Sequence, residues 1–136
     1  MCKLLVIDDN HMEHMILQTL LTHYKLFEDN NHSEDGKLSL DFLKKNRADE
    51  KSLPDLIFLD LYMPNFSGWD FLNRFNRIYR TFKKKIDVVI TSTSINPDDM
   101  LKSKSYPFVK GFFMKPLSIE TLEELNNEYS TREMHN

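Results

Sequence analysis

The sequence LIFLD at residues 56–60 decides the fold of this chain of 136 residues. Its four apolar residues lie between Pro54 and Pro64 and stop at an acid, Asp60. A short apolar run without polar alternation is typical of a strand that is buried on both faces, as in a parallel sheet. Leu4–Ile7 repeats the pattern and stops at two more acids. We therefore expect two buried strands that each end in carboxylates.

Helices and further strands alternate with these two strands. Apolar residues at three- and four-residue spacing predict helices at about 11–24, 38–43, 69–82, 96–105 and 119–128, and short apolar runs predict further strands at 26–28, 88–90 and 109–114. The Met-rich first helix is expected to bury its apolar side chains and to leave His11 and His14 on a polar face, while Asn96 is expected to cap the fourth helix. Five strands in alternation with five helices predict an α/β fold with a doubly wound parallel sheet.

Length and composition indicate one domain and restrict its class. We expect the domain at residues 1–128 and a short polar tail at 129–136, with no output domain. The net charge of −3 argues against a basic surface that binds nucleic acid. Lys83–Lys85 are expected to lie in a solvated loop. Cys2 is the only cysteine, which excludes an internal disulfide and favours a reducing compartment, the cytoplasm. No apolar stretch has the length of a signal peptide or a membrane span.

Polar side chains follow four of the predicted strands where each strand ends. Asp8 and Asp9 follow the first strand, Asp60 the central strand, Ser92 the fourth and Lys115 the fifth. Ligands of doubly wound sheets gather at the carboxyl ends of the strands. Acids that meet there repel one another unless a cation neutralises them, and oxygen ligands without His or Cys fit Mg²⁺. The pattern predicts a magnesium site in which Asp60 is the nucleophile of a phosphoryl transfer and Lys115 neutralises charge.

Four separated motifs resemble those of one family. VIDDN at residues 6–10, DLIFLDLYMPNFSGWDFL at 55–72, TSTS at 91–94 and FFMKP at 112–116 resemble the receiver domains of two-component response regulators. The likeness covers residues 3–126, and the motifs occur in the family's order. The resemblance implies a flavodoxin-like sheet of five parallel strands, in the order 2-1-3-4-5, with five helices.

The resemblance also implies a role for each charged residue of the predicted site. Asp60 would accept a phosphoryl group, and Asp9, Asp60 and the backbone carbonyl of Tyr62 would bind Mg²⁺. Asp8 would act on the ion mainly through water. Lys115 matches the lysine that pairs with the acyl phosphate, and the family implies a cis peptide bond between it and the following proline.

Three further positions match the parts of the family's switch. Ser92 matches the hydroxyl that turns inward to hold the phosphoryl group, with Thr91 as the alternative if the strand register is shifted by one. Phe112 occupies the switch aromatic position, and because it lacks the hydroxyl of tyrosine it would act by packing alone. Tyr62 and Ser94 match positions that flank the approach of water to phosphorus, so the bulky Tyr62 predicts slow loss of phosphate.

The implied function is a single-domain signalling switch that catalyses only its own phosphorylation and dephosphorylation. Its donor would be a sensor histidine kinase or a histidine phosphotransfer protein, and it would be either a relay intermediate or a terminal output. A downstream protein, or a second copy in a phosphorylation-dependent homodimer, would bind a face that includes Asn96, Met100, Lys110, Phe112 and Ile119. Two alternatives are a phosphate-independent receiver used only for binding and a Mg²⁺-dependent phosphatase with an aspartate nucleophile, whose second acid is replaced here by Tyr62.

Overall fold

The computed structural model describes residues 2–134, and its strands form one parallel sheet. The strands are β1 (Lys3–Ile7), β2 (Asp29–Ser33), β3 (Leu56–Asp60), β4 (Asp87–Ser92) and β5 (Val109–Met114). Their order in the sheet is β2-β1-β3-β4-β5, which confirms the predicted flavodoxin-like topology. Every residue of the central strand β3 is buried, as its uninterrupted apolar sequence predicted.

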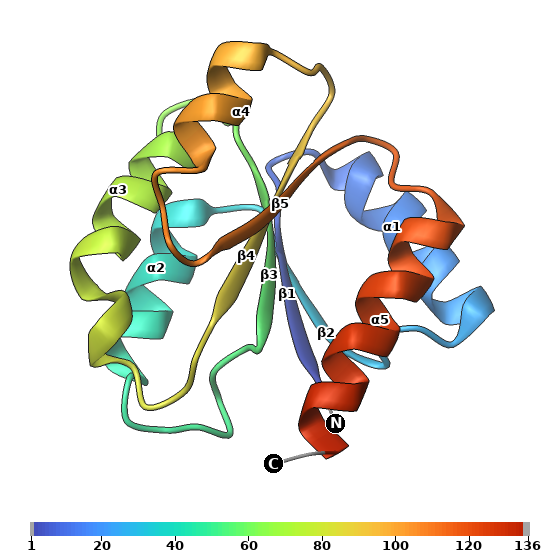
Figure 1. Cartoon of the computed structure of the whole chain (residues 1–136), viewed down its shortest axis with the longest axis horizontal. Helices are drawn as coiled ribbons and strands as arrows, with labels where there is room; N and C mark the ends of the chain where they lie inside the picture. Colours follow the sequence, from blue (N-terminus) through green and yellow to red (C-terminus); the bar gives the residue numbers. More distant parts are fainter. Residues whose placement is uncertain (1, 135–136) are drawn as a thin grey trace.

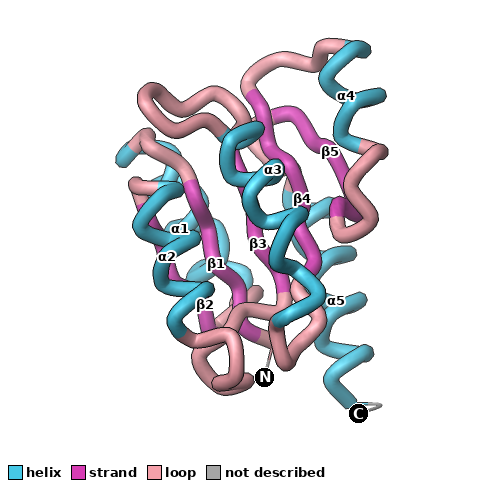
Figure 2. The backbone as a smooth tube through the Cα atoms, turned by 90° about the vertical axis from the view of Figure 1, so that its left-hand side faces the viewer, coloured by secondary structure: helices cyan, strands magenta, loops and turns pink. Residues whose placement is uncertain are grey.

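Helices cover both faces of the sheet. They are α1 (His11–Tyr24), α2 (Gly36–Lys45), α3 (Gly68–Ile78), α4 (Pro97–Ser103) and α5 (Ile119–Met134), with a 3₁₀ turn η1 (Tyr79–Thr81) after α3. Helices α1 and α5 lie on one face, and α2, α3 and α4 lie on the other (Figure 1). Figure 2 shows β2 with α1 and α2 toward one edge of the molecule and β5 with α4 at the opposite edge. Within the described residues, no helix is both long and apolar enough to cross a membrane.

The sheet separates two apolar cores of different character. The core beneath α3 is aromatic: the ring of Phe75 stacks on Phe71 and Phe82 at centroid distances of 5.7 and 5.5 Å, and it meets the edge of Phe108 at 4.8 Å. The core beneath α1 and α5 is mainly aliphatic and includes Leu4, Val6, Leu21, Leu117 and Leu122. Both cores pack against β3, so the strand that carries Asp60 is held from two sides.

The edge strand was predicted at the wrong place. Residues 26–28 were expected to form it, but β2 is the polar sequence DNNHS at Asp29–Ser33. Leu26 and Phe27 are instead buried in the aliphatic core, and the left-handed backbone of Phe27, with φ of 42°, turns the chain there. An edge strand pairs on one side only and half of its surface meets water, so β2 requires no apolar residues. The apolar pair therefore anchors the turn and does not mark the strand.

Two helices end at least four residues away from the predicted position. Helix α3 stops at Ile78 because Phe82 turns in extended conformation into the aromatic core, where its ring stacks on Phe75. Helix α5 continues beyond residue 128 to Met134, so the predicted polar tail is wrong for the residues up to that point, and residues 135 and 136 lie outside the described part. Tyr129 is buried, and its hydroxyl donates to Oδ2 of Asp87 at 2.6 Å. This contact ties the later turns of α5 to the start of β4.

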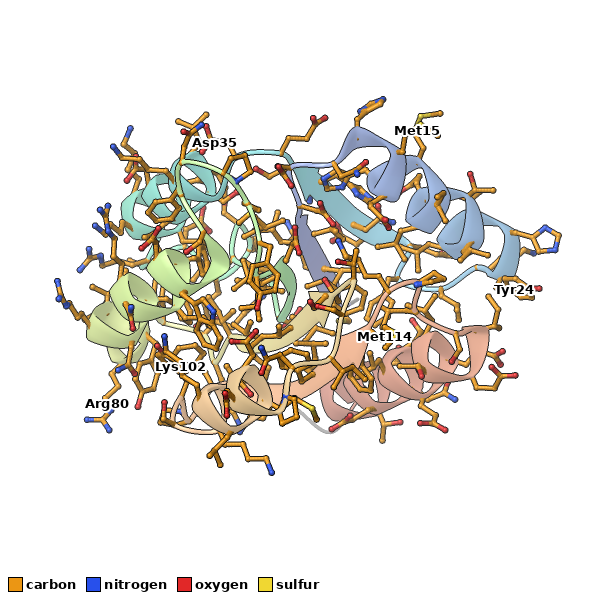
Figure 3. All side chains as sticks on the ribbon, turned by 90° about the horizontal axis from the view of Figure 1, so that it is seen from above. Met15, Tyr24, Asp35, Arg80, Lys102 and Met114 are labelled. Atoms are coloured by element: carbon orange, nitrogen blue, oxygen red, sulfur yellow. The ribbon has the colours of Figure 1, made fainter. Side chains whose placement is uncertain are left out.

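The predicted buried face of α1 is wrong in the first turns of the helix and right in the last, where Leu21 is buried and Leu20 packs against the core. Met12, Met15 and Ile16 are exposed, and Met15 points away from the body of the molecule (Figure 3). His14 and Leu21 are the buried residues of this helix. The helix is therefore rotated so that an imidazole, and not a thioether, faces the sheet.

Candidate functional site

Three carboxylates meet at the carboxyl end of the sheet. Asp8 and Asp9 follow β1 and Asp60 ends β3, and these two strands pair in register with Ile7 opposite Leu59. One oxygen from each of the three lies within 4.8 Å of the others. Asp8 and Asp60 are buried, whereas Asp9 is exposed. The strand register thus produces the acidic cluster that the sequence predicted.

A lysine from the far edge of the sheet reaches two of these acids. Nζ of Lys115, which follows β5, lies 2.7 Å from Oδ2 of Asp8 and 3.5 Å from Oδ1 of Asp60, and its side chain is only 10% exposed. Burial alone would lower the pKa of Lys115, but the hydrogen bond to Asp8 and the charge of Asp60 outweigh it and raise the pKa. The lysine is therefore held as a cation. The Lys115–Pro116 peptide bond is cis, as expected.

The surroundings of Asp60 shift the pKa of its carboxyl group. Its pKa is raised from 3.8 to about 6, because burial and the nearby charge of Asp8 raise it by more than the charge of Lys115 lowers it. The nearby backbone N–H of Tyr62 lowers the pKa of Asp60 and so favours its ionised form. One lysine does not neutralise three carboxylates, so the cluster favours a further cation. Oxygen ligands of this kind fit a hard divalent ion such as Mg²⁺.

The loop after Asp60 folds back tightly over the end of β3. The N–H of Gly68 donates to the carbonyl of Leu61 at 2.8 Å. A Cβ atom at Gly68 would lie 2.4 Å from the carbonyl oxygen of Asp60 and 2.6 Å from Cα of Leu61. Only glycine allows this approach. The close contact fixes the direction in which the chain leaves Asp60, and hence the position of Tyr62.

The two switch candidates lie on the same face of the sheet. Ser92 is fully buried, and its hydroxyl accepts a hydrogen bond from the N–H of Ser94 at 3.3 Å. Ile90 pairs with Phe112 and Ser92 pairs with Met114, so Phe112 and Ser92 belong to the same side-chain layer. Phe112 is partly buried against the aromatic core. The alternative hydroxyl, Thr91, lies in the other layer, where it lines a small cavity with Asp8 and Lys115.

Two features of the site were not predicted from the sequence. Nε2 of His14 donates to the backbone carbonyl of Asp8 at 2.6 Å, and Nδ1 of the same ring lies 2.7 Å from Nδ1 of His32 on β2. Burial, followed by the charge of His14, lowers the pKa of His32. The second feature is a hydrogen bond from the hydroxyl of Tyr62 to Oδ2 of Asp99 on α4. The helical periodicity of the sequence placed His14 on a helix but did not identify its partners. Nothing in the sequence indicated the contact between Tyr62 and Asp99.

Comparisons with known proteins agree with the motifs. The family profile described as response regulator receiver domain matches residues 4–127. The probable methanogenesis regulatory protein FilR2 of Methanothrix harundinacea is 30% identical over 125 residues, which are 92% of this chain and 79% of that protein. Sporulation initiation phosphotransferase F of Bacillus subtilis is 26% identical over 93% of this chain and 92% of its own length. Two other relatives are longer, and the chain spans 52% and 35% of them.

Solved structures share the fold. A two component response regulator from Cytophaga hutchinsonii superposes with a TM-score of 0.80 at 23% identity, over 95% of this chain and 96% of that one. The chemotaxis protein CheY4 of Vibrio cholerae gives a TM-score of 0.73 at 22% identity over 95% and 98% of the two chains. At these identities the structural likeness concerns the fold.

Proposed function

Since the chain belongs to the response regulator receiver domain family, we propose that it is a signalling switch that takes a phosphoryl group onto Asp60. The observation that carries the proposal is the convergence of three carboxylates within 4.8 Å beside a buried Lys115 that contacts two of them. The donor is a phosphohistidine of a sensor histidine kinase or of a histidine phosphotransfer protein. The name of one relative, a sporulation initiation phosphotransferase, supports transfer of phosphoryl groups.

The transfer needs an ionised Asp60. One of its carboxylate oxygens attacks the phosphorus, the new O–P bond forms as the P–N bond of the phosphohistidine breaks, and the imidazole leaves with the bonding electrons and takes up a proton. Negative charge spreads over the phosphoryl oxygens during this step. Nζ of Lys115, already 3.5 Å from Asp60, supplies positive charge to them. Mg²⁺, when bound, supplies the remaining neutralisation and orients the phosphoryl group.

The same residues would hold the ion. Asp9 and Asp60 offer carboxylate oxygens, and the backbone carbonyl of Tyr62 completes the protein ligands. Both carboxylate oxygens of Asp8 already accept hydrogen bonds, at 2.9 Å from the N–H of Asn10 and at 2.7 Å from Lys115. This occupancy supports a role of Asp8 through water. Waters and phosphoryl oxygens would fill the other positions, as is usual for Mg²⁺.

The signal leaves through the side-chain layer that Ser92 and Phe112 share. A phosphoryl group on Asp60 draws the Ser92 hydroxyl away from the N–H of Ser94. The ring of Phe112 then moves into the space that the hydroxyl has left. Leu101 and Met114 are already exposed apolar residues near this layer. The surface that a downstream protein, or a second copy, would bind includes Asn96, Met100, Lys110, Phe112 and Ile119. A coupling of about 1–3 kcal/mol between phosphorylation and partner binding is expected.

Intact-mass measurement after incubation with Mg²⁺ and a small phosphodonor such as acetyl phosphate tests the proposal. The parent protein should gain one phosphoryl group, and Asp60→Asn should gain none. Asp55→Asn is the matched control, because Asp55 is an acid at the opposite end of the same strand. Equal labelling of the parent and Asp60→Asn would contradict the assignment. A folded parent that takes up no phosphoryl group would favour the phosphate-independent binding module.

A further inference from the structure

The hydroxyl of Tyr62 bridges two loops that leave the sheet at the proposed phosphorylation site. It donates to Asp99, which lies in the first turn of α4. From this contact we propose that Asp99 is a positioning residue: it holds the Tyr62 ring across the approach to phosphorus and so slows hydrolysis of the phosphoryl group on Asp60. The inference rests on the proposed function and adds to it a control of how long the phosphorylated state lasts.

The backbone and the ring of Tyr62 are held from different directions. Its N–H lies near enough to the Asp60 carboxylate to lower the pKa of that acid, so the main chain stays beside the acceptor. The ring, in contrast, is on the outside, and the residue is 52% exposed. An exposed aromatic side chain changes rotamer rapidly unless a contact holds it. The hydrogen bond to Asp99 is such a contact, and it fixes the ring from the side opposite to the main chain.

Helix α4 presents Asp99 rigidly. The side chain of Asn96 accepts from the N–H of Asp98 at 2.9 Å and Pro97 occupies the first helical position, which confirms the predicted cap. The strands before the two loops are neighbours, with Asp60 opposite Thr91. A bridge from the loop after β3 to the helix after β4 therefore crosses the end of the sheet where the Asp60 carboxylate lies. The ring is part of that bridge.

The chemistry of hydrolysis explains the effect. A water oxygen attacks phosphorus opposite to the Asp60 oxygen, a new O–P bond forms, and the bond from phosphorus to Asp60 breaks. Asp60 keeps the electron pair, the water loses a proton to solvent, and inorganic phosphate leaves. The water must reach the outer side of the phosphoryl group, which the held ring covers. The hydrogen bond to Asp99 also raises the pKa of Tyr62, so the phenol keeps the proton that it donates.

The decisive experiment measures decay of the phosphorylated protein after the donor is removed. Asp99→Ala and Tyr62→Phe should each lose phosphate about threefold to tenfold faster than the parent, the size expected for one lost hydrogen bond. The double variant should decay no faster than either single variant, because both remove the same contact. Asp99→Asn keeps an acceptor and should decay close to the parent rate.

Asp98→Ala is the matched control, since Asp98 lies in the same helical turn and its loss changes the helix charge in the same way. It should decay at the parent rate. A second readout is the pKa of the Tyr62 phenol, followed by NMR of labelled tyrosine: Asp99→Ala should lower it toward the ordinary value of tyrosine, and Asp98→Ala should not.

The outcomes separate this inference from the proposed function. Normal uptake of phosphate together with equal decay rates of Asp99→Ala and Asp98→Ala overturns the positioning role alone. The same holds if the effects of Asp99→Ala and Tyr62→Phe multiply in the double variant. A parent protein that takes up no phosphoryl group overturns both.

Discussion

The two ends of one sheet hold acids in opposite surroundings. At the amino end, Asp55 accepts the N–H of Lys3 at 2.8 Å and lies 3.4 Å from Nζ of Lys84. Asp87, also at this end, accepts the hydroxyl of Tyr129 at 2.6 Å. At the carboxyl end the acids face one another, and burial raises the pKa of Asp60 to about 6.

The difference separates carboxylates with structural partners from the carboxylates that we propose to be functional. An acid whose oxygens receive hydrogen bonds from fixed donors contributes to stability. An acid that shares a buried site with like charges costs stability until a cation or a phosphoryl reaction changes the charge there. Both kinds occur at β3, with Asp55 just before its first residue and Asp60 at its last, so the position at a strand end does not distinguish them. Their partners do. Substitutions at the two ends should therefore change stability in opposite directions.

The largest effect is expected at the amino end. Asp87→Ala should lower the free energy of unfolding by about 2–4 kcal/mol, because the substitution leaves the buried hydroxyl of Tyr129 without its acceptor. Urea denaturation at neutral pH measures the loss. Asp87→Asn keeps an acceptor oxygen and should lose less. A change below about 0.5 kcal/mol for Asp87→Ala, the level of an ordinary surface substitution, would show that Asp87 has no structural role.

The opposite sign is expected at the carboxyl end. Asp60→Asn should raise the free energy of unfolding by about 1–2 kcal/mol at pH 7 in EDTA, because it removes a buried charge that faces Asp8. The substitution also weakens the contact with Lys115, an effect that the raised pKa of Asp60 already includes. Mg²⁺ should stabilise the parent and have little effect on this variant. If Asp60→Asn were less stable than the parent, the expected difference in sign between the two ends of the sheet would be wrong.

The pH dependence follows from the same pKa. Asp60 has a folded pKa of about 6, above its ordinary value of 3.8, so the folded state binds its proton more tightly than the unfolded state does. The cost of its charge is therefore absent below about pH 4, develops between about pH 4 and 6, and is complete above that. The advantage of Asp60→Asn should follow this curve in urea denaturation at several pH values in EDTA. If the difference in the free energy of unfolding between Asp60→Asn and the parent were constant from about pH 4 to 7, it would have a cause other than the charge of Asp60.

The sequence revealed the acids of the cluster more readily than the acids at the amino end of the sheet. Asp8, Asp9 and Asp60 each follow an apolar run directly, so the strand signal and the acid stand together in the sequence. The role of Asp87 depends on Tyr129, which is 42 residues away on a helix that was predicted to end before it. A partner of that kind is set by the packing of α5, which local periodicity does not report.

The same reason explains the other wrong predictions. The strand β2 lacks apolar residues because only one of its edges is paired, so the sequence offers no pattern there. His14 was assigned to a polar face because imidazole is usually exposed, whereas the carbonyl of Asp8 and the half-buried ring of His32 give it partners inside the molecule. The bond from Tyr62 to Asp99 joins residues 37 apart. In each case the information lies in tertiary contacts and not in the local sequence.

A smaller effect is expected for the exposed acid of the cluster. Asp9→Asn should weaken Mg²⁺ binding about tenfold, or about 1.4 kcal/mol, because one of the carboxylates that attract the ion is lost. Its stability in EDTA should change less than that of Asp60→Asn, since Asp9 is exposed and its charge is solvated. Titration with Mg²⁺, followed by calorimetry or fluorescence, measures the affinity. Unchanged affinity would remove Asp9 from the proposed ligands.

The smallest effect is expected from a lysine at the amino end. Lys84 was predicted to lie in a solvated loop, but its Nζ donates to the carbonyl of Leu53 at 2.9 Å and pairs with Asp55 at 3.4 Å. The side chains of this ion pair are 23% and 33% exposed, so water screens the charges. Lys84→Met keeps the aliphatic length of the side chain and should therefore cost no more than about 1 kcal/mol.

Lys115→Met is the matched substitution at the other end of the sheet. Lys115 is more deeply buried than Lys84 and contacts Asp8 and Asp60, so its loss leaves these two acids without their cation. Phosphate uptake should fall sharply in Lys115→Met and stay at the parent level in Lys84→Met, as measured by intact mass. If the two variants took up phosphate equally, the lysine at the carboxyl end would be one more structural cation, and the contrast between the two ends would rest on the acids alone.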